Sequence, residues 1–389
     1  MPPARWIGTS DDLSEALQLL SDSDFVALDT EFLRERTYYA TLCLIQAATP
    51  KACVIIDPLA IQDLTPLWQF LADRDRIKVL HSARQDLEVL SLAIGRSAND
   101  DPAAPRIPSR VPGPIFDTQI AAALLGSPAQ IGYATLVAER LNHSLPKGQT
   151  RTDWSQRPLT NEQLIYAADD VRYLVELYMN LRPELQSRGR LQWQNEETLE
   201  LEDSNLYRVE PADAWRRLKG LDRLHPQQRA TAKLLAEWRE GRAMRKDRPR
   251  GWILSDESLR DIADSLPGTR EDMERIRGLS SNFLRNRTDE VLELVKQGRL
   301  NGAHESPAVA SVRPDPKEQS LVTRLLTMIR EEAARSQIAP ELLGTRRDAE
   351  QLVYSGRTDH LLRGWRREVI GERLVQVATE ARGAMAQRD

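Results

Sequence analysis

Apolar segments with the pattern of β-strands are spread through the first 205 residues of the chain. They read FVALDTEF (25–32), LCLIQAAT (42–49), ACVIIDP (52–58) and IKVLHSA (77–83). The first three follow one another closely, which predicts an antiparallel meander. Apolar residues then recur at helical spacing in segments 85–95, 117–126, 133–141 and 161–185. We therefore expect residues 1–205 to form one mixed α/β domain.

The pattern changes near residue 210, because helical spacing alone continues to the end of the chain. Residues 301–318 have the composition of a linker and separate two helical modules of similar size, which we place at 211–297 and 316–389. A second Pro-rich and polar stretch, residues 97–114, is expected to be a surface loop of the α/β domain.

The composition of the chain argues against a membrane protein, a secreted protein and a zinc-binding protein. Hydrophobic residues make up 41% and charged residues 29% of the 389 residues, and no apolar run is long enough to cross a membrane. The N-terminal segment has no basic region before an apolar core, so we expect no signal peptide and a cytoplasmic protein. With five His and two Cys, a structural zinc site is not expected, and Cys43 and Cys53 are predicted to be reduced core residues.

The net charge of −4 is unevenly distributed. Residues 1–205 carry 19 basic and 29 acidic side chains, whereas residues 206–389 carry 35 basic and 29 acidic side chains. An acidic part that holds cations, followed by a more basic part, suits a polyanionic substrate. Two ordinary solvated surfaces would give the same split, so charge alone does not decide.

Acidic residues occur within the apolar patterns, where a carboxylate is costly unless something positive compensates it. Asp29 and Glu31 alternate with apolar residues on a predicted strand and therefore share one face. Asp86 follows the strand at 77–83 and lies beside Leu90 on the next predicted helix. Asp170 lies on the helix at 161–185. Since these segments contain no matching cluster of Lys or Arg, the pattern predicts bound divalent cations.

The helix around Asp170 shows which neighbours share its side. At about 100° per residue, the residues within roughly 60° of Asp170 are Tyr166, Ala167, Tyr173, Leu174 and Leu177. Asp169 falls outside this stripe and is expected to be solvated. Asp117, in FDTQIAA, is expected to cap or begin a helix instead of binding metal.

Carboxylates are the hard ligands that Mg²⁺ or Mn²⁺ prefers, and two such ions can bind both the attacking and the leaving oxygen of a phosphoryl displacement. The chain contains no GxxxxGK[ST] phosphate-binding loop, no GxSxG elbow and no HExxH helix. Phosphodiester hydrolysis is therefore the reaction class that the acids favour.

The segments DTEF, HSARQDLEVL and YAADDVRYL resemble the three exonuclease motifs of the DEDD superfamily, in its tyrosine-containing branch. The segment RTDWSQRPLTNEQLIYAADDVRYL is similar to the bacterial ribonuclease D family. Residues 211–297 resemble a helicase-and-RNase-D C-terminal (HRDC) domain, and residues 316–389 resemble the second such domain of that family. The resemblance thus covers the whole chain, although the loop at 97–114 is longer than is usual there.

The resemblance implies an RNase H-like α/β exonuclease domain at 1–205 followed by two all-α HRDC-like domains. It implies that Asp29, Glu31, Asp86 and Asp170 bind two divalent ions, Mg²⁺ or Mn²⁺, and that Tyr166 orients or helps to deprotonate the attacking water. The implied activity is 3′→5′ removal of 5′-mononucleotides from RNA, with tRNA precursors as the substrates. We expect the protein to be a monomer.

Further residues are candidates for substrate contact, each with a structural alternative. Thr30 and Phe32 flank the first acids but also fit core packing, and Gln46 could instead satisfy a buried backbone group. His81 could act near the site, but a hydrogen-bonded structural histidine is the favoured interpretation. The loop before the predicted helix at 161–185 contributes three more candidates for phosphate contact or base stacking, which are Lys147, Arg151 and Trp154. The alternative is a solvated loop that Trp154 anchors to the core.

The run from Arg239 to Arg250 contains six basic and two acidic residues. We predict RNA contact by Arg245, Lys246 and Arg248, and a simple solvated face is the alternative. Two other functions remain open at this point. The acids are equally compatible with a DNA exonuclease, because RNA is told from DNA by contacts to the 2′-hydroxyl, and a catalytically silent RNA-binding scaffold is the third possibility.

Overall fold

The computed structural model describes residues 2–97, 111–145, 152–303 and 315–386. Within these ranges six strands form one mixed sheet in the order β1-β4-β3-β2-β5-β6. The strands are β1 (Ala4–Ile7), β2 (Phe25–Leu33), β3 (Thr41–Ala48), β4 (Cys53–Ile56), β5 (Ile77–Leu80) and β6 (Ile115–Asp117). Strands β2, β3 and β4 pair antiparallel, as the predicted meander requires, and β5 pairs parallel with β2.

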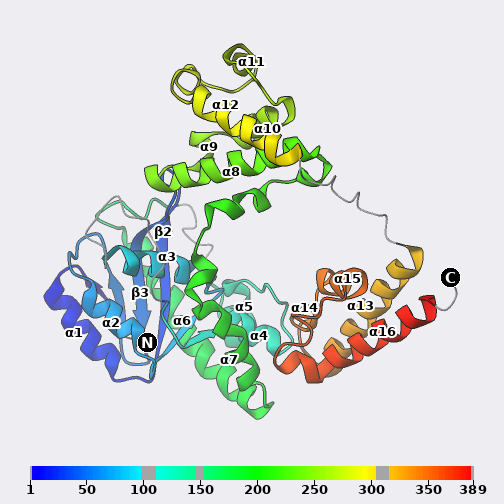
Figure 1. Ribbon diagram of the computed structural model, residues 1–389. Coiled ribbons are helices and arrows are strands. Elements are labelled where there is room, and N and C mark those ends of the chain that lie inside the picture. The colour runs from blue at the N-terminus through cyan, green and yellow to red at the C-terminus, as the bar shows by residue number, and fades with distance from the viewer. Residues whose placement is uncertain (1, 98–110, 146–151, 304–314, 387–389) are drawn as a thin grey trace.

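Helices cover both faces of the sheet (Figure 1). One face packs against α1 (Ser10–Ser21), α2 (Thr65–Ala72) and α3 (Arg84–Ser97), and the other against α4 (Thr118–Leu124), α5 (Tyr133–Leu141) and α6 (Asn161–Ser187). Strand β2 contributes to both cores, because Val26 and Leu28 face α1–α3 while Phe25 and Ala27 face α6. This alternation places the next two odd-numbered residues, both acidic, on the α6 side of the sheet.

Several predictions of local structure are confirmed. Strands β2 to β5 and helices α3 to α6 lie where the apolar pattern placed them, and both cysteines are buried and unbridged. Asp117 caps α4, because its carboxylate accepts a hydrogen bond from the backbone N–H of Gln119. The pattern missed the short edge strands β1 and β6 and the helices α1, α2 and α7 (Leu191–Leu199). Most of the predicted loop at 97–114 lies outside the described residues.

Short 3₁₀ turns between Glu200 and Arg223 lead into an all-helical region. It comprises α8 (Pro226–Lys246), α9 (Arg250–Ile253), α10 (Asp256–Ser265), α11 (Arg270–Glu274) and α12 (Ser281–Ala303), which share a separate hydrophobic core. Helix α10 begins after Ser255, whose side chain accepts a hydrogen bond from the backbone N–H of Ser258. We call this region the first helical unit.

The second helical unit contains α13 (Pro316–Ser336), α14 (Pro340–Leu343), α15 (Arg346–Ser355), a π-helical turn (Arg367–Gly371) and α16 (Glu372–Ala386). It packs back onto the α/β domain (Figure 1). Trp365 stacks on Trp193 of α7 with ring centroids 4.6 Å apart, and Glu197 accepts hydrogen bonds from both Trp365 and Arg366. The chain therefore runs through the two helical units and returns to the domain where it began.

None of the helices in the described ranges combines the length and apolarity that a membrane span requires.

Candidate active site

Acidic residues from two distant segments converge at the α6 side of the sheet. Asp29 and Glu31 extend from β2, and Asp170 extends from the middle of α6. One carboxylate oxygen from each of these three residues lies within 4.8 Å of the others. Asp86, in the first turn of α3, lies outside that triplet, but its charge acts on the three other carboxylates. The structure thus brings together the four acids that the sequence singled out.

Strand β2 explains how two acids reach the same place. Asp29 pairs with Gln46 of β3, and Glu31 pairs with Leu44. The register then shifts between Glu31 and Phe32, so that a bulge follows the second acid. A bulge bends its strand and often redirects side chains next to an active site. The bend separates the acid-bearing part of β2 from the connection that leads toward the first helical unit.

Asp86 is held by a neighbour from the same strand. The Thr30 hydroxyl donates a hydrogen bond of 2.6 Å to Asp86, and both side chains are buried. Thr30 faces the opposite side of β2 from Asp29 and Glu31, where helix α3 packs. This bond fixes the orientation of the Asp86 carboxylate relative to the strand that carries the other acids.

Helix α6 contributes a tyrosine and an acid one turn apart. The Tyr166 hydroxyl lies near the Asp170 carboxylate, and their interaction opposes the rise in the pKa of Asp170 that burial causes. Asp169 turns away from this pair and forms an ion pair of 3.2 Å with Arg172. The helical stripe deduced from the sequence is therefore correct, since Tyr166 and Asp170 share a side and Asp169 does not.

The environment disfavours negative charge on all four acids. Burial, followed by repulsion from Asp170 and Asp86, raises the pKa of Glu31 to about 8. Burial also raises the pKa of Asp170 to about 7 and that of Asp86 to about 6, although interactions with Tyr166 and Thr30 oppose these shifts. The pKa of Asp29 rises well above its usual range, chiefly through burial and then through its three acidic neighbours. A cation bound among these carboxylates would offset their mutual repulsion and lower their pKa values.

The donor set fits a hard divalent cation. Every candidate ligand atom is a carboxylate oxygen, which is the chemistry that Mg²⁺ and Mn²⁺ prefer. The spacing of the oxygens from Asp29, Glu31 and Asp170 lets them converge on one point. Burial raises the pKa of Tyr166 as well, so its phenol stays protonated at neutral pH and can donate a hydrogen bond.

Two anchors that the sequence did not indicate hold α6 in place. Arg157, in the segment before α6, forms a bidentate ion pair with Asp57 at the end of β4, with two N–O distances of 2.7 Å. Tyr133 of α5 donates hydrogen bonds to the backbone carbonyl oxygens of Asp169 and Asp170. A tyrosine at a helix start and an arginine in a loop have no pattern that would reveal these roles.

Burial argues against three of the predicted substrate contacts. Gln46 has no exposed surface, and Trp154 is buried with its ring 5.9 Å from that of Tyr166. The Thr30 side chain is buried and engaged with Asp86. Stacking of a base on Trp154 and contact between substrate and Gln46 are therefore wrong for this conformation. The alternative interpretation of Trp154, as an anchor of its loop, agrees with its packing.

The remaining candidates divide into four groups. Both ring nitrogens of His81 have partners, the Thr118 hydroxyl and the Ile131 carbonyl oxygen, as a structural histidine requires. Phe32 is half-buried and packs against the core on the α3 side. Lys147 and Arg151 lie outside the described residues. The basic candidates of the first helical unit are all exposed at the end of α8 and just beyond it; they are Arg245, Lys246 and Arg248.

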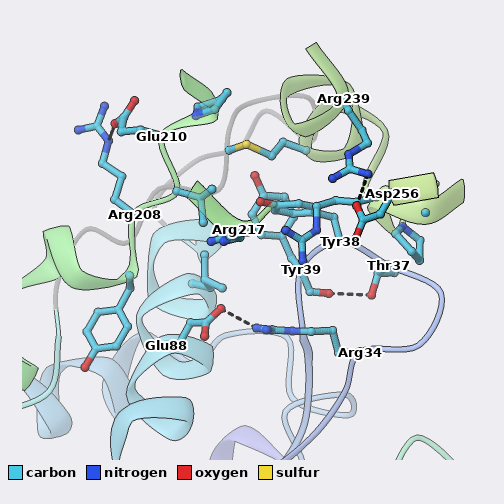
Figure 2. Close-up of a pocket in the computed structure, with 18 of the residues that line it drawn as sticks. Arg34, Thr37, Tyr38, Tyr39, Glu88, Arg208, Glu210, Arg217, Arg239 and Asp256 are labelled. Atoms are coloured by element: carbon cyan, nitrogen blue, oxygen red, sulfur yellow. Dashed lines mark hydrogen bonds and ion pairs between the residues drawn. The ribbon is translucent and has the colours of Figure 1, made fainter. Parts of the chain in front are cut away.

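The connection between β2 and β3 joins the acid-bearing strand to the first helical unit (Figure 2). Asp247 accepts hydrogen bonds of 3.0 Å from the backbone N–H groups of Tyr38 and Tyr39. The Tyr38 hydroxyl donates to Glu240, which is fully buried and also pairs with Arg217. A cavity of about 780 Å³ lies at this junction, lined from both sides.

Charges around the cavity are balanced. Arg34 pairs with Glu88, Arg208 with Glu210, and Arg239 with Asp256, at N–O distances of 2.5 to 2.6 Å (Figure 2). Because its arginines already have carboxylate partners, the cavity is a weak candidate for binding a polyanion. We interpret it as part of the contact between the α/β domain and the first helical unit.

Comparison with known proteins agrees with this site. The family described as 3′-5′ exonuclease matches residues 4–186, and the HRDC domain family matches residues 228–295. Ribonuclease D of Acidiphilium cryptum is 36% identical, over 98% of this chain and 96% of that protein. Ribonuclease D of Pseudomonas paraeruginosa is 34% identical, over 98% of this chain and 99% of the relative.

A solved structure shares the whole architecture. The crystal structure of Escherichia coli RNase D, described as an exoribonuclease involved in structured RNA processing, superposes with a TM-score of 0.84 at 31% identity. The match covers 97% of this chain and 99% of that one. The expected fold, an RNase H-like exonuclease domain followed by a helical HRDC region, is therefore confirmed.

Proposed function

Because the chain belongs to the ribonuclease D family and is thus a metal-dependent 3′→5′ exoribonuclease, we propose that Asp29, Glu31, Asp86 and Asp170 hold two divalent ions at its catalytic centre. The observation that supports this assignment is the convergence of buried and partly buried carboxylates from β2, α3 and α6. We propose Mg²⁺ or Mn²⁺ as the metal, since all the donors are oxygen atoms.

When bound, the ions would supply an activated water and would offset negative charge on the departing 3′ oxygen. The protein's own residues hold and orient the groups around that chemistry. Thr30 fixes the Asp86 carboxylate, and Tyr133 fixes the backbone at Asp170. Tyr166, protonated at neutral pH, is suited to orient the attacking water by hydrogen bonding instead of acting as a base.

We further propose that the substrates are RNAs with free 3′ ends, that the products are 5′-mononucleotides, and that tRNA precursors are trimmed. Membership of the ribonuclease D family supports this proposal, and E. coli RNase D is described as acting on structured RNA. We assign residues 1–205 to the exonuclease domain and residues 211–297 and 316–389 to two HRDC-like domains. A monomer in the cytoplasm is the working form that we propose.

One time course tests the activity and its polarity. RNA labelled at either its 3′ or its 5′ end would be incubated with Mn²⁺, and 3′→5′ trimming predicts immediate release of the 3′ label as a mononucleotide. The 5′ label should persist on shortening products, and EDTA should stop both. Early release of the 5′ label would contradict the polarity, and release in EDTA would contradict the metal requirement.

The same assay separates the alternative functions. Matched RNA and DNA oligonucleotides should be compared, with faster loss of RNA expected. Faster loss of DNA would favour a DNA exonuclease. RNA binding without any mononucleotide release would favour the catalytically silent scaffold.

A further inference from the structure

Trp252 presents its side chain to solvent beside the junction of the α/β domain and the first helical unit. Its exposure is 61%, the highest among the exposed large hydrophobic residues of the described ranges. Tyr and Trp side chains exposed in this way are common at binding surfaces, because an apolar ring in water gains from being covered. The Arg248 guanidinium lies over the ring, 5.7 Å from its centroid.

Two other tryptophans lie beside cations that a carboxylate neutralises. Arg242 lies over Trp238, but Glu290 pairs with that arginine. Arg366 lies over Trp365, which is buried, and pairs with Glu197. By contrast, no ion pair with another described residue engages Arg248, so this exposed ring carries a cation that is not neutralised.

The backbone at the end of α8 explains the excess positive charge. Asp247 ends the helix in a left-handed conformation, with φ of 46°, and its carboxylate is turned toward the backbone N–H groups of Tyr38 and Tyr39. The acid in this run is thereby directed to the α/β domain. Arg245, Lys246 and Arg248 remain exposed, without ion pairs to other described residues, on the same short stretch as Trp252.

We propose that Trp252 and Arg248 form a base-stacking site for single-stranded RNA, with Arg245 and Lys246 contacting the adjacent phosphates. This proposal rests on the proposed RNA substrate. An aromatic ring next to unpaired cations is the combination that binds single strands without sequence preference, since every base has a face that can stack. A protein partner would be a poorer match for three positive charges that form no ion pair with any described residue.

The position of this site implies that it holds nucleotides upstream of the 3′ terminus. Tyr38, which bonds to Asp247, lies seven residues after Glu31, and Trp252 lies five residues after Asp247. The extended chain spans at most about 3.6 Å per residue, so the β2–β3 connection reaches no further than roughly 25 Å from Glu31. Trp252 belongs to the first helical unit, whereas the acids belong to the α/β domain, so the two sites are separate. We therefore expect only RNA longer than the active site alone can accommodate to reach Trp252.

Binding of a length series of fluorescent oligoadenylates to the full-length protein tests the proposal. The measurements would be made in the Asp29→Asn background so that the RNA is not degraded. Trp252→Ala should weaken binding of long oligomers by about 5-fold to 100-fold, the range measured for loss of one stacked base. The defect should diminish as the RNA becomes shorter. Trp252→Phe, which keeps a ring, should recover most of the affinity.

Leu300→Ala is the matched control, because Leu300 is 60% exposed in the same helical unit and its loss should leave affinity unchanged. Equal affinity of Trp252→Ala and the parent for long RNA would overturn the stacking site, as would an equal loss at every RNA length. Failure of the parent protein to bind RNA at all would instead contradict the proposed function.

Discussion

At the scale of single residues, the site gathers carboxylates that repel one another when they are ionised. Four carboxylates, one buried and three partly buried, have raised pKa values because desolvation and mutual repulsion disfavour their ionised forms. Such a cluster is costly to the fold unless a cation compensates it, and perturbed acids of this kind concentrate at functional sites. The same feature that destabilises the metal-free protein prepares it to bind metal.

Removal of one ligand charge should separate catalysis from binding. Asp29→Asn keeps the size of the side chain but replaces a charged ligand with a neutral one. We expect turnover to fall by at least about 1,000-fold, in line with the loss of a major electrostatic contribution to catalysis. Affinity for RNA should remain within about 3-fold, as measured by fluorescence anisotropy. Loss of both turnover and binding would point to misfolding, which circular dichroism would reveal.

The raised pKa values also predict how stability depends on pH. Glu31 and Asp170 titrate at about 8 and 7 in the folded protein, above the ordinary range near 4. Their contribution to stability is therefore fully present below about pH 4 and is lost as the pH rises through 7 and 8. Without divalent cations, the melting temperature should fall by several degrees between pH 5.5 and pH 8.

Saturating Mn²⁺ should remove most of that fall, because the cation favours the ionised carboxylates that high pH creates. Differential scanning calorimetry with and without EDTA measures both effects. In Glu31→Gln, the pH dependence and the Mn²⁺-induced rise at pH 8 should both shrink. A Mn²⁺-induced rise that is equal at pH 5.5 and pH 8 would contradict this account.

These residues also mark what the sequence could and could not predict. Strand alternation and the helical stripe identified Asp29, Glu31, Tyr166 and Asp170 because a carboxylate in an apolar pattern is conspicuous. The same reasoning misjudged Trp154 as a stacking candidate, because polarity in a loop does not report how deeply its aromatic residue is buried. Burial of that kind depends on which distant elements pack over the loop.

At the scale of elements, the position of α6 depends on the segment that precedes it. Arg157 holds that segment through its bidentate pair with Asp57 and through hydrogen bonds to the backbone carbonyl oxygens of Cys43 and Trp154. Its guanidinium therefore links β3, β4 and the entry to α6. Edge strands β1 and β6 escaped prediction for a related reason, since strands of three or four residues are defined by their partners more than by their own pattern.

Arg157→Lys should impair catalysis without removing the positive charge, because an ammonium cannot reproduce the fork of the guanidinium. A displaced α6 would misplace Tyr166 and Asp170, and we expect kcat to fall by about 10-fold to 100-fold. Steady-state kinetics on a short RNA measure this effect. Arg5→Lys is the control, since Arg5 forms only exposed ion pairs with Asp12 and Glu15. Equal activity of the two variants would show that Arg157 does not position α6.

The end of α8 allows a second test at this scale. If Arg245, Lys246 and Arg248 contact phosphates, replacing all three with Ala should weaken RNA binding and make it less dependent on salt. Each phosphate contact on a single strand contributes about 0.7 to the slope of log K against log salt concentration, so the slope should decrease by about 2. A salt titration of RNA binding measures it. An unchanged slope would indicate that the basic residues between Arg239 and Arg250 form a solvated surface and do not contact phosphates.

At the scale of the whole molecule, several contacts connect the α/β domain with the helical units, and two of them are built on aromatic and acidic side chains. The first is the junction of Tyr38 with Glu240 and Asp247, and the second is the packing of Trp365 and Arg366 on α7. Composition and periodicity predicted helical modules after residue 210 but could not predict these contacts. Their partners are more than 160 residues apart, and nothing local to either partner indicates the other.

The second contact should open when its buried ion pair is broken. The side chains of Glu197 and Arg366 are 14% and 7% exposed, so Glu197→Gln leaves a guanidinium that is buried and only partly compensated. Breaking one partner of a buried pair costs up to about 3–5 kcal/mol, which is enough to shift a packing equilibrium toward the open form. Small-angle X-ray scattering should then report a larger radius of gyration, and amides of α7 and α14 should exchange hydrogen faster.

Glu372→Gln provides the matched comparison for that opening. It removes the same charge from a pair with Arg367 whose side chains are 60% and 62% exposed, close to Arg366 in the sequence. Because exposed pairs contribute little, its scattering and exchange should match those of the parent protein. If Glu197→Gln also matched the parent, the remaining contacts would suffice to hold the second helical unit in place. They include the stacking of Trp365 on Trp193 and the hydrogen bonds from Arg190 to the backbone of Ser336 and Gln337. The ion pair would then add specificity to the contact without deciding whether it stays closed.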